Sequence, residues 1–325
     1  MSQIRKNLQW VLIVLFSMGA LNAIAQDWPT KTVRVVVPFP AGGSTDTIAR
    51  LLAKKMEAAT KQSMVVENIS GGGSILGVQS VANSAADGSS LVFTGSGTIT
   101  VMKHTNVALT IDPEAVLTPI TFVNSLPHWI VVRADRPEKT FNEFMTYIRK
   151  NPGKVSISVN AIAGAAHLAL INWAKNNDLD INVVPYRGSP PAMVDLLGGV
   201  TTAHIDVVGS SMQFVKSGKA KSLAVLQTKP ITDLPDVPAS APPNEGGLLV
   251  YGQHVLAVKS GTPLPIVNRI YDVVKDVTAE PEFVEYLRSL GFERAVPTPT
   301  QSKEILLQES KRYADIIRVN QIKVN

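Results

Sequence analysis

A strand-like run that ends in a glycine-rich loop and leads into an amphipathic stretch most constrains the fold of this chain. Residues 32–37 are mostly β-branched and stop at Pro38, which cannot donate to a β-ladder. Residues 46–60 then place apolar side chains at the i, i+3, i+4 spacing of one helical face. Strand, glycine turn and helix in this order are the opening of a βαβ unit, so we expect an α/β fold.

The same alternation returns along the chain, with glycine or proline at several of the boundaries. We expect further strands at residues 63–67, 91–94, 129–133, 155–159, 182–184 and 205–208. We expect further helices at residues 71–85, 140–150, 165–176 and 191–197. From the alternation alone we predict parallel sheets covered by helices.

Length and proline content predict two interleaved lobes. The chain has 325 residues, which corresponds to about two domains. Residues 118–127 and 229–243 are rich in proline and read as exposed connections between domains. We therefore expect a discontinuous first lobe, residues 26–122 plus 228–325, a second lobe, residues 123–227, and a ligand cleft between them.

The N-terminus has the composition of a secretory signal peptide, residues 1–25. Arg5 and Lys6 precede an apolar run at residues 10–20, and small residues at 23 and 25 suit a signal peptidase. The apolar run is shorter than the roughly 20 residues that span a bilayer. We predict cleavage before Gln26 and a periplasmic protein, which is not a lipoprotein because the chain has no cysteine to lipidate.

Composition excludes several classes of chemistry. The absence of cysteine excludes disulfides, thiolate metal sites and cysteine nucleophiles. The 31 basic and 26 acidic residues are spread along the chain, so we expect no nucleic-acid partner. The sequence has no nucleophile elbow, phosphate-binding loop or zinc motif, and its five histidines are scattered. We predict no catalytic residue, no metal and no cofactor.

Four loops rich in glycine, serine or other small residues follow predicted strands, at residues 38–46, 95–98, 160–167 and 209–211. Open α/β sheets bind ligands at the carboxyl ends of their strands. Glycine lets the backbone approach a ligand, and the unpaired N–H groups of a following helix favour an anion. The loops predict a cleft lined by neutral donors. The alternative for the first loop is a structural turn with Thr45 or Asp46 as the helix cap.

Six segments in chain order carry a family resemblance. They are residues 28–50, 65–73, 151–154, 184–189, 195–199 and 234–238, which include Pro-Phe-Pro-Ala-Gly-Gly-Ser-Thr-Asp, Val-Val-Glu-Asn, Asn-Pro-Gly-Lys, Val-Pro-Tyr-Arg-Gly-Ser, Asp-Leu-Leu-Gly-Gly and Leu-Pro-Asp-Val-Pro. They resemble the signatures of the Bug-type extracytoplasmic solute receptors, the substrate-binding proteins of tripartite tricarboxylate transporters. The resemblance covers essentially the whole chain after the leader.

The resemblance implies an α/β, two-lobed Venus-flytrap fold of the periplasmic-binding-protein type II, in which each lobe is a mixed sheet flanked by helices. It implies a receptor that captures a small organic mono- or dicarboxylate and delivers it to a membrane permease; we expect a monomer. Carried over by position, the ligand-binding residues are Phe39, Ala41, Gly42, Gly43, Thr45, Asp46, Ser96, Thr98, Asn160, Ala161, Ala163, Gly164, His167 and Tyr186. We add Ser210 from the fourth loop.

Three of these residues have a structural alternative. Phe39 either covers the ligand or packs in the core, and Tyr186 either contacts the ligand or packs. His167 is either a ligand contact or a histidine that forms a hydrogen bond at a helix start.

The second-lobe loop departs from the family pattern. The family usually has Ser-Gly-x-Gly-Thr before the histidine, whereas residues 160–167 read Asn-Ala-Ile-Ala-Gly-Ala-Ala-His, with no threonine near Gly164. Residues 200–206 also differ from the usual continuation after the Gly-Gly pair. We infer from these changes that the ligand is a more apolar or aromatic acid.

Two other functions remain open at this point. A periplasmic ligand-sensing accessory of a signalling system needs the same fold and the same binding site. A secreted hydrolase needs a positioned acid, base or nucleophile, for which the sequence offers only Asp46 and His167.

Overall fold

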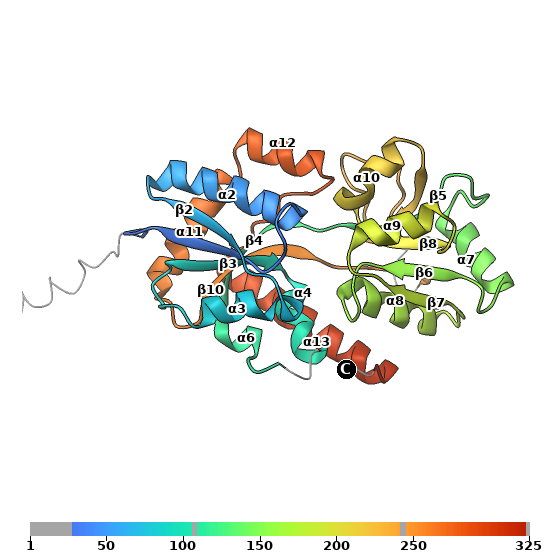
Figure 1. Ribbon diagram of the computed structural model, residues 1–325, viewed down its shortest axis with the longest axis horizontal. Coiled ribbons are helices and arrows are strands. Elements are labelled where there is room, and N and C mark those ends of the chain that lie inside the picture. Colours follow the sequence, from blue (N-terminus) through green and yellow to red (C-terminus); the bar gives the residue numbers. More distant parts are fainter. Residues whose placement is uncertain (1–27, 106–108, 241–244, 323–325) are drawn as a thin grey trace, which may run out of the picture.

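The computed structural model describes residues 28–105, 109–240 and 245–322, which form two separate five-stranded sheets (Figure 1). The first sheet has the strand order β2-β1-β3-β10-β4, and the second has the order β7-β6-β8-β5-β9. The predicted signal peptide, with its cleavage site before Gln26, lies outside the described residues. Within the described segments, no helix has the length and apolar character needed to cross a membrane.

The first lobe is built from both ends of the chain. Its strands are β1 (Val33–Val37), β2 (Met64–Asn68), β3 (Ser90–Gly95), β4 (Leu117–Ser125) and β10 (Gln253–Lys259). Its helices are α2 (Ser44–Thr60), the 3₁₀ turn η2 (Gly72–Ser74), α3 (Ile75–Ala82), α4 (Gly97–Thr100), α5 (Met102–Thr105), α6 (Pro113–Val116), α11 (Leu264–Val277), α12 (Pro281–Ser289) and α13 (Pro299–Asn320).

The second lobe comes from the middle of the chain. Its strands are β5 (His128–Arg133), β6 (Ser156–Val159), β7 (Asn182–Pro185), β8 (Ala203–Val207) and β9 (Ala220–Val225). Its helices are α7 (Phe141–Lys150), α8 (Ala165–Asn176), α9 (Ser189–Leu197) and α10 (Val208–Lys216). In Figure 1 this lobe lies to the right of the first.

One predicted helix is interrupted. The segment predicted as a helix at residues 71–85 forms the turn η2 and then the shorter helix α3. Gly71, Gly72 and Gly73 have φ angles of 132°, 56° and 66°, which are incompatible with a right-handed α-helix. The glycines that were expected to open the helix therefore delay it.

Both sheets are mixed, as the family resemblance implies and as the alternation alone did not predict. β1 pairs in parallel with β2 and β3, and β6 pairs in parallel with β7 and β8. β10 runs antiparallel to β3 and β4, and β5 runs antiparallel to β8 and β9. β5 and β10 are the strands that begin after a crossing between lobes, so they enter their sheets from the end at which the parallel strands finish.

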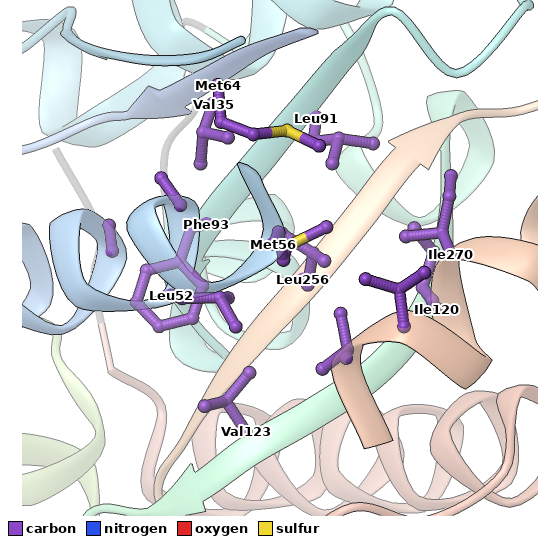
Figure 2. Packing of buried hydrophobic residues seen from close by; sticks show 14 of the residues in the cluster. Val35, Leu52, Met56, Met64, Leu91, Phe93, Ile120, Val123, Leu256 and Ile270 are labelled. Atoms are coloured by element: carbon purple, nitrogen blue, oxygen red, sulfur yellow. The ribbon is translucent and has the colours of Figure 1, made fainter. Parts of the chain in front are cut away.

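Helices cover both faces of each sheet. In the first lobe, Val35 and Phe93 project toward Leu52 and Met56 of α2 (Figure 2). Val36, the next residue along β1, belongs to a separate cluster with residues of α3 and α13, because side chains alternate between the faces of a strand. Complete burial of each such side chain contributes roughly 1.5–3 kcal/mol to stability, so the sheet is held rigidly on both sides.

The first crossing joins the carboxyl edges of the two sheets. Ser125 ends β4 opposite Gln253, the first residue of β10, and the next residue of β10 lies opposite Gly95 at the end of β3. After a two-residue connection, His128 begins β5 opposite Val207, the last residue of β8. The segments that follow β1, β3, β6 and β8 therefore lie at the edges where the lobes adjoin.

The first proline-rich stretch differs from its predicted form as an exposed connection. Residues 117–125 form the edge strand β4, and Pro119 lies opposite Ala257, beside a register shift in the pairing. Proline is tolerated there because an edge strand has one unpaired side and a bulge interrupts the ladder. Since β4 continues beyond residue 122, we propose moving the boundary between the lobes to the connection after Ser125.

The last helix links the lobes a third time. α13 packs in the first lobe, yet its end reaches α8 of the second. Lys175 Nζ donates to the carbonyl oxygen of Val319 at 2.9 Å, and Asn320 Nδ2 donates to Asn172 Oδ1 at 3.1 Å. Contacts between the lobes thus exist besides the two connections.

Candidate functional site

Each lobe gathers its predicted loops at the carboxyl edge of its own sheet. Residues 38–43 follow β1, and the neighbouring strand β3 ends at Gly95. The predicted loop at residues 95–98 is mostly the start of the short helix α4, which begins at Gly97. Residues 160–164 and 186–188 follow β6 and β7, which are neighbours in the second. The fourth predicted loop is instead the start of a helix, because α10 begins at Val208 directly after β8. Ser210 is an exposed residue in the first turn of α10.

The first loop ends at a helix N-terminus that no side chain caps. Gly43 is the N-cap of α2, with φ −75° and ψ 168°, and no side-chain hydrogen bond is made there. Ala41, Gly42 and Gly43 are exposed. Because the first N–H groups of a helix have no partner inside it, the start of α2 presents donors at the edge of the lobe.

Asp46 holds this loop in place. Its buried carboxylate accepts hydrogen bonds from the backbone N–H of Gly42 at 2.9 Å, from Asn68 Nδ2 at 2.9 Å and from Arg50 Nε at 3.1 Å. Burial by itself raises the pKa of Asp46, but the hydrogen bonds from Arg50, Gly42 and Asn68 outweigh it and lower the pKa. Asp46 is therefore ionised, its carboxylate oxygens accept these hydrogen bonds, and it does not cap α2.

His254 of β10 orients the hydroxyl of Thr45. Its Nδ1 lies 3.1 Å from Asn124 Oδ1, and its Nε2 lies 2.9 Å from Thr45 Oγ1. Burial lowers the pKa of His254 to about 3, so the ring is neutral and carries one proton. Asn124 Oδ1 is an acceptor, because the amide Nδ2 donates to the carbonyl of Ser125 at 2.7 Å. The proton is therefore on Nδ1, and Thr45 donates to Nε2.

Ser96 and Thr98 direct their hydroxyls into the first lobe. The buried Ser96 Oγ donates to Glu309 Oε1 on α13 at 3.1 Å, and Thr98 Oγ1 accepts from Thr94 Oγ1 at 2.8 Å. Burial raises the pKa of Glu309 to about 7. The second loop of this lobe is thus attached through its side chains to the core and to the C-terminal helix.

The second lobe repeats the uncapped helix start of the first. Gly164 is the N-cap of α8, with φ −78° and ψ 172°, and it too lacks a side-chain cap. His167 Nδ1 accepts the backbone N–H of Ala163 at 2.9 Å, and burial lowers the pKa of His167. A neutral ring that accepts at Nδ1 carries its proton on Nε2. Beside it, Ala161 is exposed and Ile162 is 74% exposed.

A buried aspartate organises the second-lobe loops. Asp206, at the end of β8, is fully buried and accepts hydrogen bonds from Asn160 Nδ2 at 2.8 Å and from Ser189 Oγ at 2.5 Å. It also accepts the backbone N–H of Val207 at 2.8 Å, and His204 Nε2 lies 3.8 Å away. One carboxylate therefore joins the loop after β6 to the first residue of α9.

Two aromatic residues at the edges make contacts within their own lobes. The Tyr186 hydroxyl donates to Asp195 Oδ2 of α9, and this hydrogen bond raises the pKa of Tyr186 to about 12. Phe39 is partly buried against the first-lobe core, and its carbonyl accepts from Asn68 Nδ2 at 3.1 Å. Phe39 therefore has the packing contact of its structural alternative, whereas Tyr186 has a hydrogen bond within its own lobe.

The residues that hold the loops were missed in the sequence. Asp206 lies between Ile205 and Val207 in β8, and His254 is followed by four apolar residues in β10; a polar group beside such residues indicates a buried side chain with a specific partner. The partners Asn124 and Asn160 come from other strands or loops, so the sequence pattern does not identify them. Among the described residues, no group of three His, Asp or Glu side chains is arranged as metal ligands.

Comparison with known proteins identifies the family of this chain. Residues 48–322 match the family described as the tripartite tricarboxylate transporter family receptor. The chain is 28% identical to the protein BugT of Bordetella pertussis, over 94% of each chain.

Solved structures share the fold. The periplasmic binding protein BugD is similar with a TM-score of 0.76 and 30% identity, over 91% of this chain and 99% of that one. MatC from Rhodopseudomonas palustris with bound malate has a TM-score of 0.74 and 27% identity, over 89% and 100% of the chains. Rpa4515 of R. palustris with adipate has a TM-score of 0.80 and 26% identity, over 91% and 99%. The predicted fold class and family are confirmed. The chain belongs to the tripartite tricarboxylate transporter receptor family, whose members are periplasmic solute-binding proteins of the Bug type.

Proposed function

We propose that this receptor binds a small organic carboxylate between its lobes, with one carboxylate group at the N-terminus of α2. The observation that carries the proposal is the pair of glycine-capped helices, α2 in one lobe and α8 in the other. Their N-caps Gly43 and Gly164 have nearly the same extended backbone and no side-chain cap. Other helices, such as α9 and α10, also start without a side-chain cap, but the glycine N-cap of α9, Gly188, has a positive φ of 100° and does not share this backbone. The starts of α2 and α8 are free to donate to a ligand.

The energetics require several donors. A helix N-terminus stabilises an anion by about 0.3–1 kcal/mol at an exposed site and by up to about 2 kcal/mol when partly buried. One helix alone would bind at best weakly, whereas donors from both lobes that converge on one ligand add up. Contacts to both lobes also favour the closed arrangement over the open one, because only a difference in affinity shifts such an equilibrium.

We propose that the distal end of the ligand is apolar or aromatic. The loop after β6 presents Ala161 and the exposed Ile162 at the lobe edge, and the buried Asp206 behind it disfavours a second carboxylate there. Malate and adipate, bound in the two related structures, are the dicarboxylates to compare with it. Calorimetric titration with malate, adipate, citrate and benzoate tests this point. Tighter binding of every dicarboxylate than of benzoate would contradict it.

The carboxylate site itself is tested by Gly43→Val. A Cβ at Gly43 meets only the carbonyl oxygen of Pro40, at 4.0 Å, and the φ of −75° suits any L-residue, so the fold should persist. The valine side chain would occupy the space in front of the first turn of α2, and we expect loss of carboxylate binding at that helix start. Gly198→Ala, at an exposed glycine after α9 with φ −74°, is the control. Unchanged affinity in a folded Gly43→Val protein would remove this loop from the site.

We propose that the protein is exported with cleavage before Gln26, acts as a free monomer without a lipid anchor, and passes its ligand unchanged to a membrane permease. The third link between lobes and the two crossings provide the hinge for opening and closing. Mass spectrometry of the exported protein tests the cleavage site, and light scattering tests the monomer. Comparing uptake with induction of uptake genes in a deletion strain separates transport from sensing. Degradation of the bound acid during long incubation would favour a hydrolase instead.

A further inference from the structure

A pocket lies between α8 of the second lobe and α13 of the first, away from the proposed carboxylate site. It has a volume of about 160 Å³ and is enclosed by α8 of the second lobe, α13 of the first, and residues 247–251 of the second crossing. No residue predicted to bind the carboxylate lines it. Its lining on α8 runs from Ala169 to Asn176, so it begins four residues beyond the start of that helix, which is roughly 6 Å along the axis.

Arg312 supplies the charge of this pocket. Its guanidinium carbon lies 4.1 Å from the ring centre of Tyr251 and 5.2 Å from that of Tyr313. A guanidinium that stacks on a ring keeps donors at its edge available for a carboxylate. Arg318, two turns further along α13, pairs with Asp315 at 2.9 Å, whereas no carboxylate among the described residues forms an ion pair with Arg312.

The other walls are neutral. The described lining contains aromatic rings, aliphatic side chains and asparagine amides, and it contains no Asp or Glu. The two nearest acids in sequence lie one turn away on either side and have other partners: Glu309 accepts from Ser96 in the first lobe, and Asp315 pairs with Arg318. Burial raises the pKa of Glu309 to about 7, so it cancels the charge of Arg312 only in part near neutral pH.

We propose that this hinge-side pocket is a second ligand site, which binds a small aromatic carboxylate through the Arg312 guanidinium while the ring packs against Trp173 and Tyr251. A carboxylate there can accept two parallel hydrogen bonds from the guanidinium, and a flat ring matches the aromatic walls. The occupant contacts both lobes and the crossing segment, so it also stabilises their contact.

The test uses benzoate as the probe and the mature chain with Gly43→Val, which blocks the proposed carboxylate site. Trp173 reports directly, because its indole lines the pocket and donates to the carbonyl of Gly246 at 2.8 Å. Its indole N–H signal in an NMR spectrum is assigned by its loss in Trp173→Phe. We expect benzoate to shift this signal in a saturable manner and to raise the thermal unfolding midpoint.

Arg312→Gln should weaken benzoate binding in this background by about tenfold or more, since it removes a charge-assisted hydrogen bond. Arg318→Gln is the matched control on the same helix and should leave the binding unchanged. The Trp173 shift in the Arg312-intact protein is a direct readout if Arg312→Gln fails to fold. Absence of any saturable Trp173 shift, or an equal affinity in folded Arg312→Gln, overturns the proposal. Because the readout is the Trp173 signal, this result is independent of whether Gly43→Val abolishes carboxylate binding at the N-terminus of α2.

Discussion

The hydroxyl of Thr45, in the first turn of α2, donates to Nε2 of His254 in β10 at 2.9 Å, although the residues are 209 positions apart in the chain. The helix that presents the proposed carboxylate site is thereby attached to the strand that begins at the second crossing. Asn124, near the end of β4, completes the chain of hydrogen bonds. Helix, strand and first crossing are thus joined by three side chains.

Thr45→Val tests this attachment. The substitution leaves the buried His254 Nε2 without a donor, which should cost about 1–3 kcal/mol of stability, and it should weaken carboxylate binding. Thr45→Ser keeps the hydroxyl and should retain both properties. Thr47→Val, which removes a hydroxyl that donates only to Ser44 O at 3.1 Å, is the control on the same helix. Urea unfolding and calorimetry measure the effects; a Thr45→Val protein as stable as Thr47→Val would contradict the prediction.

Asp206→Asn should loosen the second-lobe loops. An amide presents only one acceptor oxygen to the donors of Asn160, Ser189 and Val207, so at least one buried donor is left unpaired. We expect a loss of about 1–3 kcal/mol in stability and about tenfold weaker ligand binding. Asp178→Asn, an exposed change in the same lobe, should do neither. Binding at full strength in Asp206→Asn would show that these loops do not need the aspartate.

Acid should destabilise the protein through its buried histidines. Burial lowers the pKa of His128 to about 4 and that of His254 to about 3, below the ordinary 6.5 that each has when unfolded. Between these values the unfolded state binds more protons, so stability is complete above about pH 6.5 and falls as pH decreases toward 4. Each histidine contributes on the order of 1 kcal/mol per pH unit. Urea midpoints that do not change between pH 7 and pH 5 would contradict this.

The contribution of Glu309 to stability should decrease, not increase, as pH rises. Burial raises its pKa from 4.5 to about 7, so the folded state binds the extra proton, and this contribution to stability is lost as pH rises through 7. Glu309→Gln keeps a neutral group at the same place. The stability of the variant relative to the unsubstituted protein should therefore increase from pH 5 to pH 7, by on the order of 1 kcal/mol per pH unit. Glu304→Gln, exposed on the same helix, should show no such trend.

Local elements followed closely from local patterns. The apolar period and the glycine before it placed α8 at residues 165–176, where the structure has it. The β-branched run and Pro38 placed β1 within one residue of its start. The run Gly71–Gly73 is the exception, because three consecutive positive φ angles interrupt a helix that periodicity alone predicts.

The sequence pattern did not predict how distant segments pair with one another. The proline content of residues 118–127 predicted a connection, yet most of this stretch is β4, since a free sheet edge with a register shift accommodates Pro119. Ser210 was placed in a loop because glycine and serine mark turns, but β8 passes directly into α10.

The sequence by itself determined most of the strand–loop–helix units and the family, because these depend on residues close together in the chain. Tertiary structure alone decided how the loops are held. Thr45 meets His254, Asn160 meets Asp206, and Ser96 meets Glu309 only after strands and helices pack. Burial then sets which of these groups are charged, and neither the partner nor the burial of a side chain is written in its neighbours along the chain.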